Sequence, residues 1–169
     1  EGYIFDMEIP GDACMSQKEA VNEVRNDMLT LNSIIVTELE KVGLKAHTHP
    51  PHQWAMNLGP EFTGPLDHFS NSDPSIVHVT FGDVVDVEDD RKFGILSGDD
   101  LVARLAMELP DIESLIFAMG GVDGLLKVPP HKATDDDLLE FWSPDVSYEG
   151  LHQSDIDVTG GIGLKITRG

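Results

Sequence analysis

Apolar residues recur at helical spacing between residues 16 and 43. Because an α-helix turns once every 3.6 residues, this spacing gathers them on one face. Ser16 and Glu19 form a capping-box pattern at the start of the stretch, and Gly43 marks its end. The pattern predicts a long amphipathic helix. Its apolar positions are Val21, Val24, Met28, Leu31, Ile35 and Leu39.

Shorter apolar runs predict strands. Residues 44–48 are long enough for a short strand, and the continuous apolar runs at 76–81 and 114–119 are typical of buried strands. Residues 84–86 and 93–96 flank an acidic turn, which predicts a small exposed hairpin.

Two further helices are predicted between and after these strands. Ser97 begins a helix that ends before Pro110, and residues 134–142 read as a capped acidic helix. A last helix opens at Thr159. The order of strand, loop, helix and strand predicts an α/β fold with a mostly parallel central sheet covered by helices on both faces.

Composition narrows the class of protein. The 169 residues are 40% hydrophobic, enough for one core. The formal charge of −20, from 11 basic and 31 acidic residues, argues against nucleic acid or an anionic membrane as partner. The single cysteine, Cys14, allows no internal disulfide, and no apolar run reaches the ~20 residues of a membrane span. We therefore expect a cytoplasmic protein.

Four glycine-containing segments, three of them with aspartate, follow predicted strands or open predicted helices. In open α/β sheets, ligands bind at the carboxyl ends of the strands, where backbone N–H groups and helix N-termini converge. Glycine lets the backbone approach an anion, and carboxylates and lysines serve phosphoryl transfer. Each segment alone is more often a plain turn. The four are Gly82-Asp83, Ser97-Gly98-Asp99-Asp100, Gly120-Gly121-Val122-Asp123-Gly124, and Thr159-Gly160-Gly161 with Lys165.

Taken in order, these motifs resemble the amino acid kinase superfamily and, within it, the isopentenyl phosphate kinase family. The resemblance is carried by the ILSGDD block at 95–100, the VDG block at 122–124 and the TGG block at 159–161, and it extends over residues 24–166. It implies an amino acid kinase-like fold and transfer of the γ-phosphoryl group of ATP, with Mg²⁺, onto isopentenyl phosphate. It also implies a substrate-side part at 1–70, a nucleotide-side part at 71–169 and a homodimer.

The resemblance assigns roles to individual residues. Asp99 is expected to orient catalytic lysines, and Lys165 to contact the phosphates of ATP. The alternatives are that Asp99 only caps a helix and that Lys165 is a solvated side chain. The expected nucleotide-binding residues are Gly82, Asp83, Ser97, Gly98, Val122, Asp123, Gly124, Thr159, Gly160 and Gly161.

The chain also departs from the family pattern. Residues 1–23 carry neither the lysine-glycine-glycine-serine turn nor the glycine-rich loop with a substrate-binding histidine, and Gly120-Gly121 stands where Thr-Asp is usual. The chain therefore reads as an interior piece, incomplete at both ends. The second hypothesis is a catalytically degenerate kinase-fold subunit with a structural or regulatory role in a larger complex.

The histidine- and proline-rich segment at 47–56 allows two further interpretations. His47, His49 and His52 are close enough in sequence to bind a divalent cation, although loop histidines more often lie at the surface or in packing contacts, and we assign no metal ligands. The resemblance places the apolar tail of the substrate in this region, so the apolar residues here either line that tail or belong to the core. They are Pro50, Pro51, Trp54 and Met56.

Overall fold

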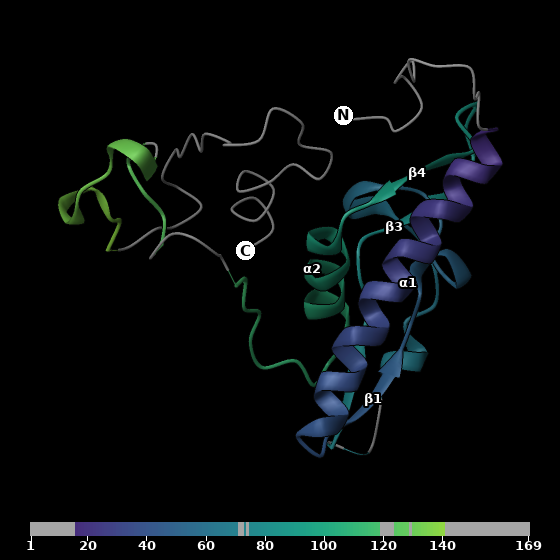
Figure 1. Ribbon diagram of the computed structural model, residues 1–169, viewed down its shortest axis with the longest axis horizontal. Coiled ribbons are helices and arrows are strands. Elements are labelled where there is room, and N and C mark those ends of the chain that lie inside the picture. Colours follow the sequence, from purple (N-terminus) through teal and green to yellow (C-terminus); the bar gives the residue numbers. More distant parts are fainter. Residues whose placement is uncertain (1–15, 71–72, 74, 119–123, 129, 141–169) are drawn as a thin grey trace.

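The computed structural model describes residues 16–70, 73, 75–118, 124–128 and 130–140 (Figure 1). Its main elements are α1 (Gln17–Lys41), β1 (Lys45–Thr48), β2 (Ile76–Val79), β3 (Asp83–Asp86), β4 (Phe93–Leu96) and α2 (Gly98–Glu108). Short 3-10 turns connect them, among them η2 (Pro51–Gln53) and η4 (Asp67–Phe69). The helix predicted at Thr159 lies outside the described residues.

Helix α1 forms where its pattern predicts. The hydroxyl of Ser16 accepts a hydrogen bond from the backbone N–H of Glu19, and the Glu19 carboxylate accepts one from the N–H of Ser16. This capping box satisfies donors that have no partner inside the helix. On the inner face, Arg25 donates from Nε to the carbonyl of Val84 at 2.8 Å and pairs with Asp86. These bonds attach α1 to β3.

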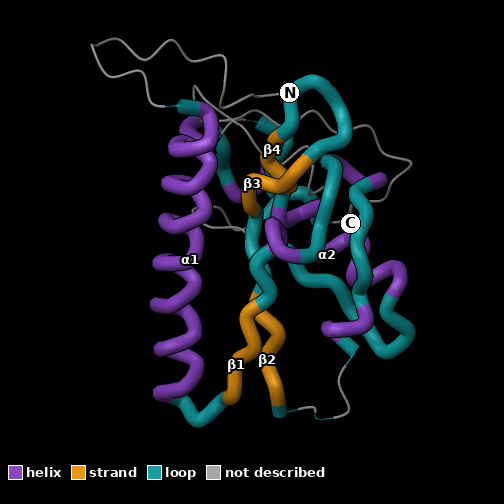
Figure 2. Tube along the Cα trace, turned by 90° about the vertical axis from the view of Figure 1, so that its right-hand side faces the viewer, coloured by secondary structure: helices purple, strands orange, loops and turns teal. Residues whose placement is uncertain are grey.

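The strands form two small sheets rather than one continuous sheet among the described residues. β1 and β2 are parallel, with Lys45 opposite Ile76, and β3 and β4 form the predicted antiparallel hairpin. Figure 2 shows the strands between α1 on one side and α2 on the other. The described structure is therefore mixed α/β, and the predicted central parallel sheet covered on both faces is not shown.

The core lies between the hairpin, α2 and the segment after β1. Five buried residues form it, and the half-buried side chains of Trp54 and Leu58 pack against them. Burial of these apolar side chains removes surface from water, which is the main favourable contribution to folding. The core residues are Ala55, Phe62, Val85, Leu96 and Leu101.

The predicted strand at 114–119 is wrong over its described part. Residues 114–118 are irregular, and the side chain of Ile116 is 82% exposed. A strand needs a partner for its backbone groups, and no strand of the described residues pairs with this segment. An apolar run was not enough to specify a buried strand.

The predicted helix at 134–142 is also wrong over its described part, because only a 3-10 turn, η6 (Asp135–Asp137), forms there. The three aspartates favour the first turn and cap of a helix over its interior. Beyond the turn, Leu139 donates to the carbonyl of Leu125 at 2.8 Å and Leu138 forms a bridge with Leu126. The backbone of residues 138–139 therefore pairs with that of residues 125–126 instead of continuing a helix.

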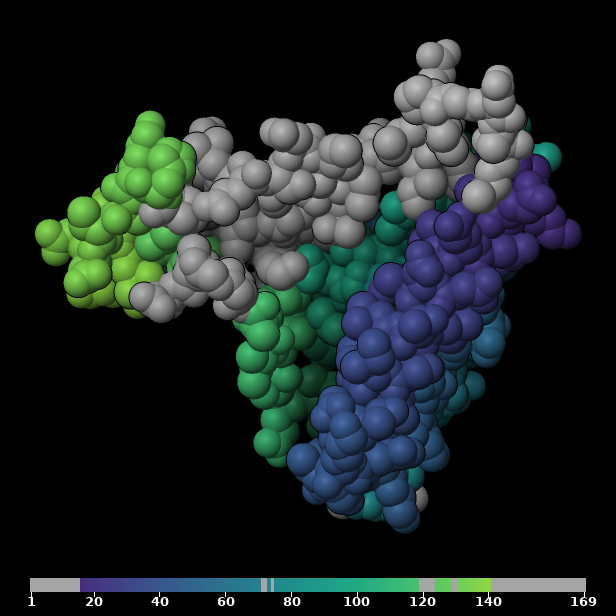
Figure 3. Space-filling model, viewed as in Figure 1, coloured from purple at the N-terminus to yellow at the C-terminus, as the bar shows by residue number. Residues whose placement is uncertain are grey.

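The outer face of α1 is open in the space-filling view (Figure 3). Leu31, Ile34 and Ile35 are each more than two-fifths exposed on this helix. Within the described part of the chain, no helix is both long and apolar enough to cross a membrane.

Candidate functional site

The structure brings two of the four expected loops together. A Cβ added to Gly82 would lie 3.3 Å from the backbone N of Gly98 and 3.4 Å from the carbonyl oxygen of Leu96. A Cβ on Gly98 would in turn lie 3.5 Å from the backbone N of Gly82. The backbones of the two loops therefore approach to a distance that glycine permits most easily. Gly98 is the first residue of α2, so the meeting point lies at a helix N-terminus.

The first turn of α2 carries the acidic pair of the ILSGDD block. Ser97 is the N-cap, and its hydroxyl accepts a hydrogen bond from the N–H of Asp99 at 3.2 Å. Asp99 is half-buried and Asp100 is buried, and both carboxylates lie near the positive end of the helix dipole. Ser97 rather than Asp99 therefore caps α2 with its side chain, and Asp99 lies in the first turn next to Gly98.

Asp83 is fully buried and turned inward, which the sequence did not indicate. Its Oδ2 accepts hydrogen bonds from the backbone N–H of His52 at 3.1 Å and from His52 Nδ1 at 2.6 Å. Its Oδ1 accepts from the backbone N–H of Val84 at 2.8 Å. The side chain of Asp83 has no exposed surface, whereas that of His52 is 17% exposed. The whole residue is 1% exposed, so the Asp83 carboxylate is used within the protein and does not face a ligand.

The histidines of residues 47–52 do not gather on one point. His52 pairs with Asp83, while His49 Nε2 lies 2.8 Å from Nδ1 of His78. The ring of His49 also lies 4.9 Å from that of His68. Among the described residues, no group of three or more histidine, cysteine or acidic side chains is arranged to hold a metal ion. The possible cation site of His47, His49 and His52 is therefore not formed.

The cluster around His49 disfavours positive charge. Burial, the largest cause, and the neighbouring charges of His68, His78 and His47 together lower the pKa of His49 to about 4. Phe69 lies against this cluster, with ring centroids 4.5 Å from His49. Burial lowers the pKa of His68 and His78 as well, so these three histidines pack in the form without charge.

The apolar residues near this segment belong mostly to the core. Pro50 and Pro51 are buried, and Trp54 packs against the core while its Nε1 donates to the carbonyl of His49. Met56 is 41% exposed. The packing interpretation therefore holds for the first three, and Met56 alone remains open to solvent.

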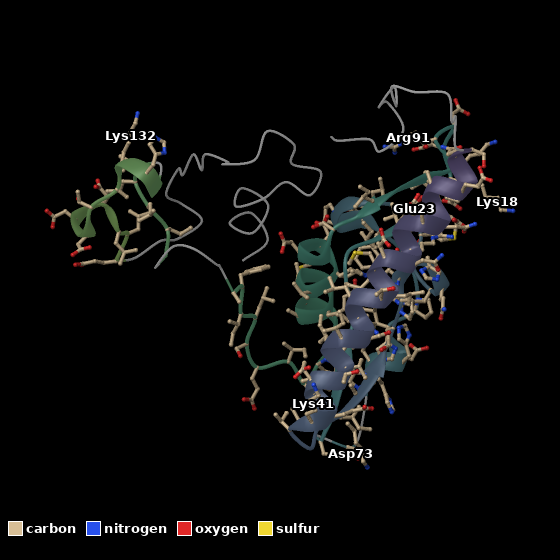
Figure 4. The ribbon with its side chains drawn as sticks, in the orientation of Figure 1. Lys18, Glu23, Lys41, Asp73, Arg91 and Lys132 are labelled. Atoms are coloured by element: carbon tan, nitrogen blue, oxygen red, sulfur yellow. The ribbon has the colours of Figure 1, made fainter. Side chains whose placement is uncertain are left out.

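Of the third loop, only Gly124 lies among the described residues. Gly124 belongs to a small unit of residues 124–128 and 130–140, which Figure 1 shows apart from α2. Lys132 of this unit lies far across the view from α1 and α2 in Figure 4. The other expected residues of the third and fourth loops lie outside the described residues: Val122, Asp123, Thr159, Gly160, Gly161 and Lys165.

Comparison with known proteins shows which kinase the chain is similar to in sequence. No model of a known protein family matches it. The isopentenyl phosphate kinase of Thermoplasma acidophilum is 29% identical to it over 167 residues, which cover 97% of this chain and 64% of that protein. The chain is a distant homologue of isopentenyl phosphate kinase. The resemblance of its motifs to this kinase family is thus confirmed, and the chain spans just under two thirds of the relative.

A solved structure supports the same fold. The X-ray structure of an isopentenyl phosphate kinase superposes with a TM-score of 0.60 at 24% identity, over 73% of this chain and 53% of that chain. The mixed α/β arrangement of the described residues is therefore that of part of an isopentenyl phosphate kinase fold. The His52–Asp83 pair was missed because 31 residues separate its members and no local spacing signals their contact.

Proposed function

We propose that this chain supplies the nucleotide-side and part of the substrate-side region of an ATP- and Mg²⁺-dependent kinase that converts isopentenyl phosphate to isopentenyl diphosphate. The observation that carries the proposal is the contact of Gly82 with Gly98 at the N-terminus of α2. Two bare glycine backbones beside the first turn of a helix suit a phosphate group, because N–H groups and the helix dipole favour an anion there.

The two glycines let their loops pack backbone against backbone at this point. A Cβ at Gly82 would lie 3.3 Å from the backbone N of Gly98, closer than an ordinary contact, so a larger residue would push the loop away from the N-terminus of α2. In the proposed mechanism, Asp99 orients a lysine and Lys165 neutralises charge on the transferred phosphoryl group. Bound Mg²⁺ would offset charge on the nucleotide phosphates. Catalysis of this kind rests on positioning and charge stabilisation rather than on covalent steps.

The remaining nucleotide-binding roles are part of the same proposal. Residues 122–124 and 159–161 would complete the phosphate site from the other side, with Val122, Asp123 and Gly124 nearest the nucleotide. The two small sheets would belong to one larger sheet covered by helices, and the enzyme would act as a cytoplasmic homodimer. Support for these points comes from the homology to the Thermoplasma acidophilum enzyme.

A second candidate function is a non-catalytic kinase-fold subunit of a larger assembly. Two observations favour it. The Asp83 carboxylate accepts three hydrogen bonds from within the protein, and residues 130–140 stand apart from α2 in Figure 1. Such a subunit would retain the fold without transferring phosphate.

Transfer of phosphate from ATP to isopentenyl phosphate by the full chain separates the two candidates. The kinase proposal predicts Mg²⁺-dependent formation of isopentenyl diphosphate, with Lys165→Ala lowering the rate by at least about tenfold, as loss of one charged contact to the phosphates would. Lys132→Ala is the matched control, because Lys132 is exposed in the separate 124–140 unit. A folded chain that neither binds ATP nor forms product supports the subunit instead.

A further inference from the structure

Three histidines from distant parts of the chain pack ring against ring beside the β1–β2 sheet. They are His49, which follows β1, His68 of η4 and His78 of β2, and together we call them the histidine cluster. The ring centroid of His49 lies 4.9 Å from that of His68 and 5.0 Å from that of His78. Phe69 of η4 adds a fourth ring, 4.4 Å from that of His68. The cluster therefore joins η4 to the sheet.

Side chains, rather than a strand ladder, hold η4 in this place. The backbone N–H groups of Phe69 and Ser70 donate to carbonyl groups of their own short segment. Phe69 is buried, and the ring of Trp54 lies edge-on to those of His68 and Phe69. The attachment of η4 to the rest of the structure thus depends on indole, phenyl and imidazole rings.

The hydrogen bonding of the cluster requires rings without charge. His49 Nε2 lies 2.8 Å from His78 Nδ1, so one of these nitrogens donates and the other accepts. A proton added to the accepting nitrogen breaks this bond, because two N–H groups would then face each other. Nε2 of His68 and Nε2 of His78 are buried and have no hydrogen-bond partner among the described residues. Protonation of either ring therefore buries a positive charge whose N–H donor lacks an acceptor.

The elements packed around the cluster do little to offset a positive charge. His47 of β1 adds another imidazole at its edge, with its ring centroid 6.0 Å from that of His78. From α1, the uncharged Asn32 contacts the last residue of β1. Burial lowers the pKa of His68 more than the nearby carboxylate of Asp67 raises it. Protons added to the cluster thus meet further imidazoles and one outweighed carboxylate.

The cluster also anchors the segment that leads to Asp83. The N–H of His49 donates to the carbonyl at the end of β2 at 2.8 Å. Its own carbonyl accepts from Thr80 Oγ1 at 3.0 Å and from Trp54 Nε1 at 3.3 Å. Between His49 and Trp54 lies η2, from which a backbone N–H donates to the buried carboxylate of Asp83. Release of the cluster would therefore loosen residues 49–54 as well as η4.

We propose that the histidine cluster is an acid-sensitive conformational switch. In the neutral form it holds η4 and residues 49–54 against the β1–β2 sheet. Acidification opens it locally, because positive charges would otherwise lie side by side in a buried place. The inference goes beyond the proposed kinase function and does not depend on phosphate transfer.

The expected size of the effect follows from His49. Burial, the largest cause, and the neighbouring histidines lower its pKa from 6.5 to about 4 in the closed form. In an open form the pKa returns to about 6.5, so the closed form is favoured above this pH and loses ground as the pH falls toward 4. Between pH 7 and pH 5, His49 alone should raise the ratio of open to closed molecules about twentyfold. The lowered pKa values of His68 and His78 act in the same direction.

Amide hydrogen exchange of the full chain at pH 7 and pH 5, corrected for the intrinsic exchange rates, tests the proposal. Exchange at residues 45–49 and 66–69 should become about twentyfold faster or more at pH 5. The amides of α2 should remain better protected than these segments at both pH values, since the opening is local. A change of less than about twofold at residues 66–69 would overturn the switch. Equal protection of α2 and these segments at pH 5 would also overturn it, because acid would then act on the whole fold.

Two variants assign the effect to the cluster. His49→Phe keeps a ring in contact with Phe69 but cannot be protonated, so the increase in exchange at residues 66–69 should be several-fold smaller. His131→Phe is the matched control, because His131 is exposed in η5 (Pro130–Lys132), and its increase should equal that of the unchanged protein. Equal increases in the two variants would contradict the role of His49. The comparison of pH 7 with pH 5 in the unchanged protein decides the proposal whether or not His49→Phe folds.

Discussion

Replacement of the buried Asp83 by asparagine should destabilise the protein strongly. The amide can still accept from the N–H of Val84, but its NH₂ group would face the backbone N–H of His52, which now donates to Oδ2 at 3.1 Å. A hydrogen bond to a charged group contributes about 1.5–3 kcal/mol, and an unpaired buried donor costs about 1–3 kcal/mol. The expected loss is therefore about 3–5 kcal/mol in the free energy of unfolding, which lies within the sum of these two contributions.

Urea denaturation followed by circular dichroism measures this loss. With a slope of about 2 kcal/mol per molar urea, the midpoint should fall by about 1.5–2.5 M while the slope stays the same. Asp90→Asn is the matched control, because Asp90 is exposed in the β3–β4 turn and should change stability by less than about 0.5 kcal/mol. If Asp83→Asn unfolds at the same urea concentration as Asp90→Asn, the reasoning about the buried carboxylate is refuted.

Three further predictions concern the pH dependence, the core and the first helix. The pKa of His49 in the folded protein is lowered to about 4, so below about pH 6.5 the unfolded chain binds a proton that the folded chain does not. Stability should therefore fall as the pH drops from about 6.5 to 4. Melting curves should show a smaller loss of stability at low pH in His49→Phe, and an equal loss would contradict this. Leu101→Ala, at a fully buried core position, should cost about 2–5 kcal/mol in chemical denaturation, against little for Leu31→Ala on the half-exposed face of α1. Ser16→Ala removes the α1 cap and should cost about 1 kcal/mol, with faster amide exchange confined to the first turn.

Local features of the fold could be predicted because their signals are local. The capping box of Ser16 and Glu19 and the cap at Ser97 fix the starts of α1 and α2. The hairpin of β3 and β4 follows from two apolar runs around an acidic turn. Each signal lies within a few residues, so one stretch of sequence contains all the information that it needs.

Features that depend on distant partners could not be predicted in the same way. The run at 114–118 has the composition of a strand but no pairing strand among the described residues. The residues at 134–140 begin like a helix, yet their backbone bonds return to Leu125 and Lys127. Pairing across a chain is decided by tertiary packing, which overrides local propensity.

In the candidate site, too, some features follow from local sequence and others depend on distant partners. The Gly82 and Gly98 loops were expected to meet because both follow strands or open a helix, and the structure places them in contact. The inward orientation of Asp83 was not expected, since it depends on His52 in another part of the sequence. A motif indicates which backbone can approach a phosphate, while the partner of each side chain comes from the fold.

The measurement that tests the central claim most directly is amide hydrogen exchange of the full chain with and without Mg²⁺ and a non-hydrolysable ATP analogue. If four loops form one phosphate site, saturating nucleotide should slow exchange together at residues 82–83, 97–100, 122–124 and 159–161, with little change at the exposed β3–β4 turn. Saturable nucleotide binding that protects other segments, or protection at only one of these loops, would contradict a common triphosphate site.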